Sequence, residues 1–188
     1  MRYPRVPMHF EFTHRFRAPS AVVLQAMLDP RFPEYLLSHH PKMLEAVVLE
    51  RNDSGDVVRR RVRYLPKPII ESVGPKKIPP EYLAFVEESS IDLHAKTFEF
   101  KNVPTVAGVA KHLVNGGSMS FVDTNGGCER HAKGSLEIKN LPFLLRPLGA
   151  LAERIIYSEA QKLLDAEAEV LQSFIDEHGL AAGQTASA

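Results

Sequence analysis

The longest patterned stretch of the chain, from Leu141 to His178, has the periodicity of an amphipathic helix. Apolar positions recur at helical spacing along it, and charged or amide residues fill the opposite side. A helix of this length needs an apolar partner surface, because intrinsic propensity alone leaves helices marginal. Glu159 and Glu167 fall inside the apolar arc, so they are the first candidates for function.

Most of the remaining chain alternates between apolar and polar positions, as strands with one buried face do. In the first such run, from Met8 to Ala18, Phe10, Phe12, His14 and Phe16 share one side. Two short helices follow it, and turn sequences such as Asn125-Gly126-Gly127 separate the later runs. The pattern predicts the short helices near 20–28 and 32–37, and further strands at 43–51, 57–65, 82–89, 95–103, 118–123 and 129–139.

The order of these elements predicts an α+β fold in which a curved antiparallel β-sheet wraps around a long C-terminal α-helix, with two short helices after strand 1. A gap between sheet and helix would form an apolar cavity. We predict one such domain over 8–178, an N-terminal extension over 1–7 and a flexible C-terminal tail over 179–188. Segment 106–114 fits either a strand extension or a short helical turn.

Segment 67–80 differs from the rest, because it contains four prolines and cannot form an internal strand. We expect a long loop there. Lys76 and Lys77, next to isoleucines, would suit a lid that makes transient contact with a membrane. A plain surface loop explains the same residues equally well.

Composition narrows the function classes. The chain of 188 residues has 23 basic and 23 acidic residues, so no net charge draws it to nucleic acid. No apolar run is long enough to span a bilayer, and no hydrophobic run of a secretory signal follows the N-terminal arginines.

A single cysteine, Cys128, suits a reducing compartment. We therefore expect a cytoplasmic protein, and Arg130 and His131 beside Cys128 could lower its thiol pKa.

Motifs at both ends of the domain resemble the START-like, or SRPBCC, superfamily. The sequence 16–24, which continues into 28–35, is similar to its opening strand, alanine-proline helix entry and second helix. Near the other end, 116–121, 125–127, and 134–139 running into 148–153 resemble its final hairpin and helix entry. The resemblance covers nearly the whole domain and implies a helix-grip fold, which in this superfamily serves lipid transport and polyketide cyclisation.

A second, local similarity is to PRELI-type lipid-transfer domains. Residues 88–92, followed by 96–100 and Asn102, look like the central strand pair of that group. This similarity implies a lipid-like ligand rather than an enzyme. The substrate-contacting residues of that group find no match elsewhere in the chain.

Strand and helix periodicity also selects candidate ligand-binding residues. Arg130 and His14 lie on inward parities of their strands, so with Glu159 they could orient the polar end of a ligand. The competing interpretations are that Arg130 faces solvent, that His14 has a purely structural role, and that Glu159 is a paired carboxylate at the edge of the groove. The apolar wall would consist of Phe10, Phe12, Phe98, Phe100, Leu136, Leu148, Ile155 and Leu163. No metal-ligand spacing links the histidines, and we expect neither metal nor cofactor.

The sequence thus favours a protein that binds or transports a hydrophobic small molecule, plausibly a lipid, between sheet and helix. One alternative is a cyclase or dehydratase in which His14 or Glu159 acts as general acid or base, so that both would lie in one site. Another is a protein-interaction module with a vestigial cavity and an exposed apolar patch. Ligand identity and oligomeric state stay open.

Overall fold

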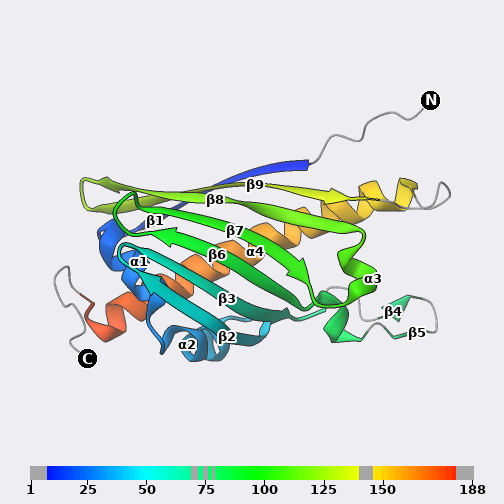
Figure 1. Cartoon of the computed structure of the whole chain (residues 1–188), viewed down its shortest axis with the longest axis horizontal. Coiled ribbons are helices and arrows are strands. Elements are labelled where there is room, and N and C mark those ends of the chain that lie inside the picture. Colours follow the sequence, from blue (N-terminus) through cyan, green and yellow to red (C-terminus); the bar gives the residue numbers. More distant parts are fainter. Residues whose placement is uncertain (1–7, 69–71, 74–75, 78, 140–145, 181–188) are drawn as a thin grey trace.

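The computed structural model describes residues 8–68, 72–73, 76–77, 79–139 and 146–180, with side chains in all of these except 72–73, 76–77 and 146–156. A long helix, α4 (Arg146–His178), lies along a strongly curved sheet (Figure 1). The predicted helix start near Pro142 falls outside the described residues. The strands are β1 (Met8–Phe16), β2 (Met43–Ser54), β3 (Val57–Pro66), β6 (Phe85–Asp92), β7 (Thr97–Pro104), β8 (Leu113–Thr124) and β9 (Gly127–Ile138).

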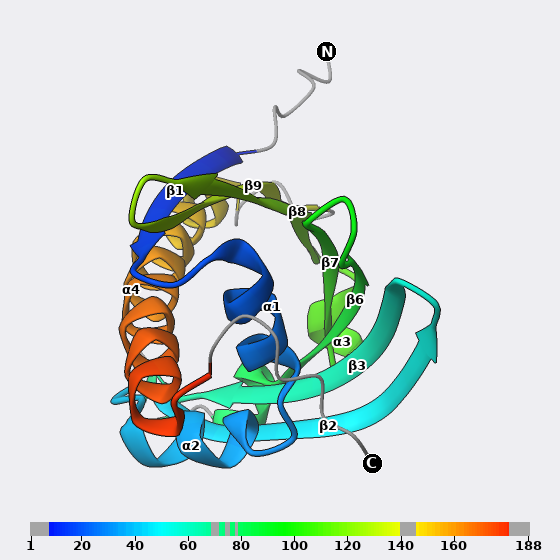
Figure 2. The ribbon, with the colours of Figure 1, turned by 90° about the vertical axis from the view of Figure 1, so that its left-hand side faces the viewer.

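These seven strands form one antiparallel sheet in the order β1-β9-β8-β7-β6-β3-β2. Figure 2 shows how the sheet curves from β1 round to β2, with α4 beside β1. Two short helices, α1 (Ser20–Leu28) and α2 (Phe32–His39), follow β1 and contact α4. The predicted α+β architecture, including both short helices, is therefore confirmed.

Glycines allow the sheet to curve this tightly between β8 and β9. Gly117 and Gly134 are paired across these strands. A Cβ atom on Gly117 would collide with the Lys133 carbonyl, and one on Gly134 would collide with the Phe10 ring. Only glycine permits this close approach of neighbouring strands, and interior glycines mark such bends.

The structure differs from the sequence prediction at the first hairpin turn, and it decides the structure of the ambiguous segment 106–114. The first hairpin turns at Gly55, with φ of +59°, and the expected turn residues Asn52 and Asp53 belong to β2, where an ion pair joins Arg51 to Asp53. The ambiguous segment 106–114 contains both predicted structures, a short helix α3 (Ala107–Ala110) and the start of β8.

The described residues of segment 67–80 lie outside the main sheet, as the prolines of the segment predict. Its described part holds a two-residue pair, β4 (Ser72–Val73) with β5 (Lys76–Lys77), and then a 3-10 helix, η1 (Pro80–Leu83). Within the described helices, no segment is long and apolar enough to cross a membrane.

The core lies between the inner face of the sheet and the helices. Val23, Leu171 and Phe174 are fully buried, and they join inward side chains of the strands such as Ile91 and Phe98 in one cluster. Alternate residues of each strand point into this cluster, so the parity of a strand residue decides whether it faces α4 or solvent.

Candidate functional site

The inner face of the sheet presents aromatic side chains toward the core. The Phe10 and Phe12 rings are stacked with centroids 5.4 Å apart, and Phe12 contacts Tyr157 of α4 at 5.5 Å. Further along the sheet, Phe98 is 1% exposed and lies 6.2 Å from the Phe100 ring. Phe10, Phe12, Phe98 and Phe100, which the sequence assigned to the apolar wall of a ligand site, thus lie on the inner face.

The remaining predicted wall residues are only partly described. Leu136 is buried on β9, and Leu163 is half-buried on α4, where its carbonyl oxygen lies 3.1 Å from His40 Nε2. The side chains of Leu148 and Ile155 lie outside the described residues. Their role in ligand binding stays a prediction.

Arg130 is fully buried and connects the sheet to α4. Its Nη1 donates to Glu167 Oε2 at 2.7 Å, and its Nη2 donates to His14 Nδ1 at 3.2 Å. Since a guanidinium can only donate, His14 Nδ1 accepts, and His14 Nε2 carries the proton that it donates to Asp165 Oδ1 at 2.9 Å. We call His14, Arg130, Asp165 and Glu167 the Arg130 network.

Most polar groups of the Arg130 network have partners within the chain, and Arg130 Nε is the one that is buried without a hydrogen-bond partner among the described residues. Glu167 matches the charge of Arg130, whose guanidinium also lies 5.4 Å from the Phe16 ring. Both ring nitrogens of His14 are engaged. Burial, assisted by the nearby Arg130 charge, lowers the pKa of His14, although Asp165 and Glu167 oppose the shift. The network is therefore a cross-link between strand and helix.

Glu159 is a largely buried carboxylate that is paired with two lysines. Its carboxylate lies 2.6 Å from both Lys42 Nζ and Lys162 Nζ, which lower its pKa. Eight residues separate it from Glu167, or about 12 Å along a helix. The two residues of the enzyme hypothesis, His14 and Glu159, thus have separate partners.

Sequence reasoning missed a second group of inward polar residues. Arg60 on β3 lies 3.7 Å from Glu87 on β6, and both side chains are at most 14% exposed. Burial raises the pKa of Glu87, against the effect of Arg60, and burial together with Glu87 raises the pKa of Tyr64. Asn102 and Asn115 continue this group across β7 and β8.

Strand parity was the signal that could have found these residues. Arg60 stands in a basic run, but it alternates with Val58 and Val62, which are 2% and 1% exposed, whereas Arg61 faces outward. In the same way, Asn102 shares the parity of Phe98 and Phe100.

Solved structures of other proteins share this architecture. No protein-family model and no curated protein sequence matches the chain. Among solved structures, the Zhui aromatase/cyclase of Streptomyces sp. R1128 has a TM-score of 0.65 at 12% identity, covering 96% of this chain and 100% of that one. TTHA0849 of Thermus thermophilus has a TM-score of 0.63 at 16% identity, covering 91% of this chain and 99% of that one. The chain has the helix-grip fold that these structures share.

A third structure with the helix-grip fold is a norcoclaurine synthase of Thalictrum flavum, in complex with a transition state analogue. It has a TM-score of 0.61 at 12% identity and covers 95% of this chain and 99% of that one. At this identity the likeness establishes the helix-grip fold alone, so function has to be argued from this chain's own residues.

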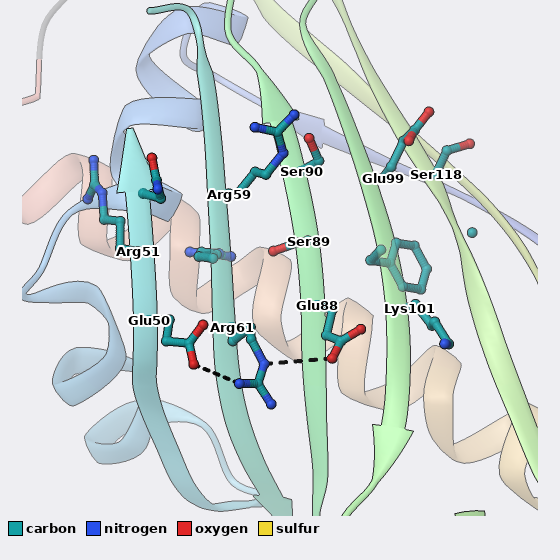
Figure 3. Close-up of a pocket in the computed structure, with 14 residues that line it drawn as sticks. Glu50, Arg51, Arg59, Arg61, Glu88, Ser89, Ser90, Glu99, Lys101 and Ser118 are labelled. Carbon is teal, nitrogen blue, oxygen red and sulfur yellow. Dashed lines mark hydrogen bonds and ion pairs between the residues drawn. The ribbon is translucent and has the colours of Figure 1, made fainter. Parts of the chain in front are cut away.

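The outer face of the helix-grip sheet carries a groove of about 1010 Å³ (Figure 3). Its charged side chains have both signs, and Arg61 forms ion pairs with Glu50 at 2.7 Å and with Glu88 at 3.6 Å. Arg63 is similarly paired with Glu45. The outward residues Arg61 and Arg63 therefore belong to a solvated, charge-balanced surface, which does not resemble the lining of a site for a hydrophobic ligand.

Cys128, a further sequence candidate for chemistry, finds no support in the structure. Cys128 is buried, and burial raises the pKa of its thiol to about 11, so its basic neighbours do not activate it. Among the described residues, no cluster of three or more His, Cys, Asp or Glu side chains could hold a metal ion.

Proposed function

We propose that the protein binds a hydrophobic small molecule, plausibly a lipid, between the inner face of the sheet and α4, and carries or senses it. One observation carries this proposal: buried side-chain oxygens of Asn102 and Asn115 have no hydrogen-bond partner among the described residues. Native interiors leave few such atoms unpaired, since each one costs free energy. Polar atoms of this kind, set in a surface that also holds Phe98 and Phe100, fit the lining of a small-molecule site.

The local similarity to PRELI-type domains supports a lipid as the ligand. It covers the strand pair β6–β7, which contributes Glu87 and Asn102 to the inner face. Release to a membrane through the 67–80 loop is part of this proposal and rests on the sequence, because the side chains of 69–78 lie outside the described residues.

Binding is tested with the full chain by displacement of Nile red, an uncharged fluorescent hydrophobe, and by native mass spectrometry of the protein as purified. We expect saturable binding at one site or a co-purified apolar molecule. Absence of saturable binding to any hydrophobe would contradict the proposal.

A pair of neighbouring substitutions on β7 locates the site. Phe100→Ser removes an aromatic side chain from the inner face and should weaken Nile red binding about tenfold, because burial of such a side chain contributes about 1.5–3 kcal/mol. Glu99→Ser changes the exposed outer face of the same strand and should leave the affinity unchanged. Equal effects of the two substitutions would place the dye outside the proposed site.

A second candidate function is protein interaction at the edge strand β2. Four apolar side chains, Leu44, Val47, Val48 and Leu49, are 42% to 46% exposed there. An edge strand with exposed apolar side chains can pair with an extended segment of a partner. Val48→Lys should abolish such an association in size-exclusion chromatography with light scattering, whereas hydrophobic ligand binding should persist.

A further inference from the structure

The middle of the inner face carries a continuous row of polar side chains. Glu87 pairs with Asn102 across β6 and β7, and Asn102 pairs with Asn115 across β7 and β8. Val62 and Leu136 occupy the flanking positions on β3 and β9. We call Glu87, Asn102 and Asn115 the polar row.

Each member of the polar row has a buried side-chain oxygen without a hydrogen bond, and Glu87 Oε1 has only the longer ion-pair contact with Arg60. Glu87 Oε1, Asn102 Oδ1 and Asn115 Oδ1 lack a hydrogen-bond partner in the part of the chain that the structure describes. Their positions in adjacent strands bring the three side chains together, because directly opposed residues have Cβ atoms about 5 Å apart. Three neighbouring acceptors of this kind match a ligand that donates hydrogen bonds.

The charges around the polar row are already balanced. Arg60, whose side chain is 9% exposed, has Nη2 3.7 Å from Glu87 Oε1. Its Nη1 donates to the Met27 carbonyl oxygen at 2.7 Å, and its guanidinium lies 5.6 Å from the Phe98 ring. The other inward arginine, Arg130, is matched by Glu167. Among the described side chains, both of these arginines have an acidic partner, so neither offers an unmatched charge to an anion, and Arg60 Nε is a buried donor without a hydrogen bond.

An anionic ligand would also lose its hydration in this buried part of the inner face, which is unfavourable without an unmatched cation. The raised pKa of Glu87, caused by burial, is consistent with an environment that disfavours negative charge. A neutral polar group avoids this cost.

We propose that the polar row binds the hydroxyl group, or another uncharged hydrogen-bond donor, of a neutral hydrophobic ligand, and that it discriminates against fatty acids and other anionic amphiphiles. This inference rests on the proposed function and adds the ligand's chemical class to it. It differs from the sequence expectation, in which Arg130 would bind a carboxylate or phosphate head group.

Matched ligand series test the inference with the full chain. Naphthalene, 2-naphthol and 2-naphthoate form one series, and dodecane, 1-dodecanol and dodecanoate form another; each competes with Nile red. In at least one series we expect the hydroxyl compound to bind about tenfold or more tightly than both its hydrocarbon and its carboxylate. Equal affinities of alcohol and hydrocarbon, or tighter binding of the carboxylate, would overturn the inference.

The outcomes separate the inference from the proposed function. Saturable Nile red binding without preference for the hydroxyl compound leaves the hydrophobic site in place and removes the role of the polar row. Absence of any saturable binding removes both.

Substitutions in the polar row test whether its side chains cause the preference for the hydroxyl compound. Asn102→Leu and Asn115→Leu should each reduce the affinity for the hydroxyl compound about tenfold and leave that for the hydrocarbon unchanged or higher. The matched control is Lys101→Leu, which alters the exposed outer face next to Asn102 and should retain the preference. The inference fails if both asparagine variants keep the wild-type preference, or if Lys101→Leu removes it.

Discussion

The Arg130 network and the polar row lie on the same inner face but are built differently. In the network, the two terminal nitrogens of Arg130 contact Glu167, His14 and the Leu164 carbonyl, so sheet and helix match most of its donors, and its Nε lacks a hydrogen-bond partner among the described residues. In the polar row, Asn102 and Asn115 carry oxygens without such partners among the described residues. A buried polar group with partners within the chain can support the fold, whereas one without them lowers stability unless a ligand binds. The comparison separates residues that hold the domain together from residues that could recognise a ligand.

The largest expected effect comes from breaking the Arg130 network. Arg130→Met leaves Glu167 and His14 without their shared donor in the interior, and loss of one partner of a buried ion pair costs about 3–5 kcal/mol. We expect a decrease of that size in the free energy of unfolding, measured by urea denaturation.

The control for this variant lies on the same two strands. Arg15→Met removes an exposed ion pair with Glu129, in which the Arg15 side chain is 84% exposed, and should cost less than about 1 kcal/mol. Similar losses in the two variants would contradict a structural role specific to the Arg130 network.

Substitution in the polar row should change stability in the opposite direction. Asn102→Leu replaces an unpaired buried amide by an apolar side chain of similar size, which removes a cost of about 1–3 kcal/mol. We expect the ligand-free protein to gain about 1 kcal/mol in urea denaturation. A loss of several kcal/mol would mean that Asn102 supports the fold as Arg130 does, and the comparison between the two regions would collapse.

The two regions should also respond to pH with opposite signs. The pKa of His14 is lowered from 6.5, mainly by burial, so the unfolded chain takes up a proton before the folded one as pH falls. The His14 contribution is therefore full above about pH 6.5 and is lost below it. The pKa of Glu87 is raised from 4.5, mainly by burial, so its contribution is present below pH 4.5 and is lost as pH rises through the folded pKa.

Denaturation at several pH values tests these signs. Compared with wild type, His14→Gln should lose less stability between pH 7 and 5, by at most about 1.4 kcal/mol per pH unit. Glu87→Gln should gain stability over wild type as the pH is raised from about 4 to about 8. Parallel pH profiles of wild type and either variant would contradict the corresponding assignment.

Much of the fold could be predicted because alternation and helical periodicity are local signals. The parity of β1 placed His14 among phenylalanines, and the parity of β9 placed Arg130 inward, where both are found. The same signal applies to Arg60 and Asn102. Arg60 is harder to recognise as an inward residue because it stands among other arginines in the sequence, although its parity matches that of Val62.

The contact partners of each inward residue could not be predicted from local sequence patterns. Periodicity states which side of α4 a residue occupies, but the sheet position opposite that residue depends on how the strands are staggered against the helix. Glu159 and Glu167 share the apolar arc, yet one meets Lys42 and the other meets Arg130. Only the tertiary arrangement distinguishes these two carboxylates.

The smallest expected effect concerns Glu159, the carboxylate that the sequence favoured as a ligand contact. Its ion pairs with Lys42 and Lys162 involve lysines that are 39% and 55% exposed, so solvent weakens both. Glu159→Gln should change the free energy of unfolding by less than about 1 kcal/mol. It should also keep the preference for a hydroxyl ligand, because Glu159 is not in the polar row. Loss of that preference in competition binding would mean that Glu159 contributes to ligand recognition, and the ligand-binding residues would then include part of α4.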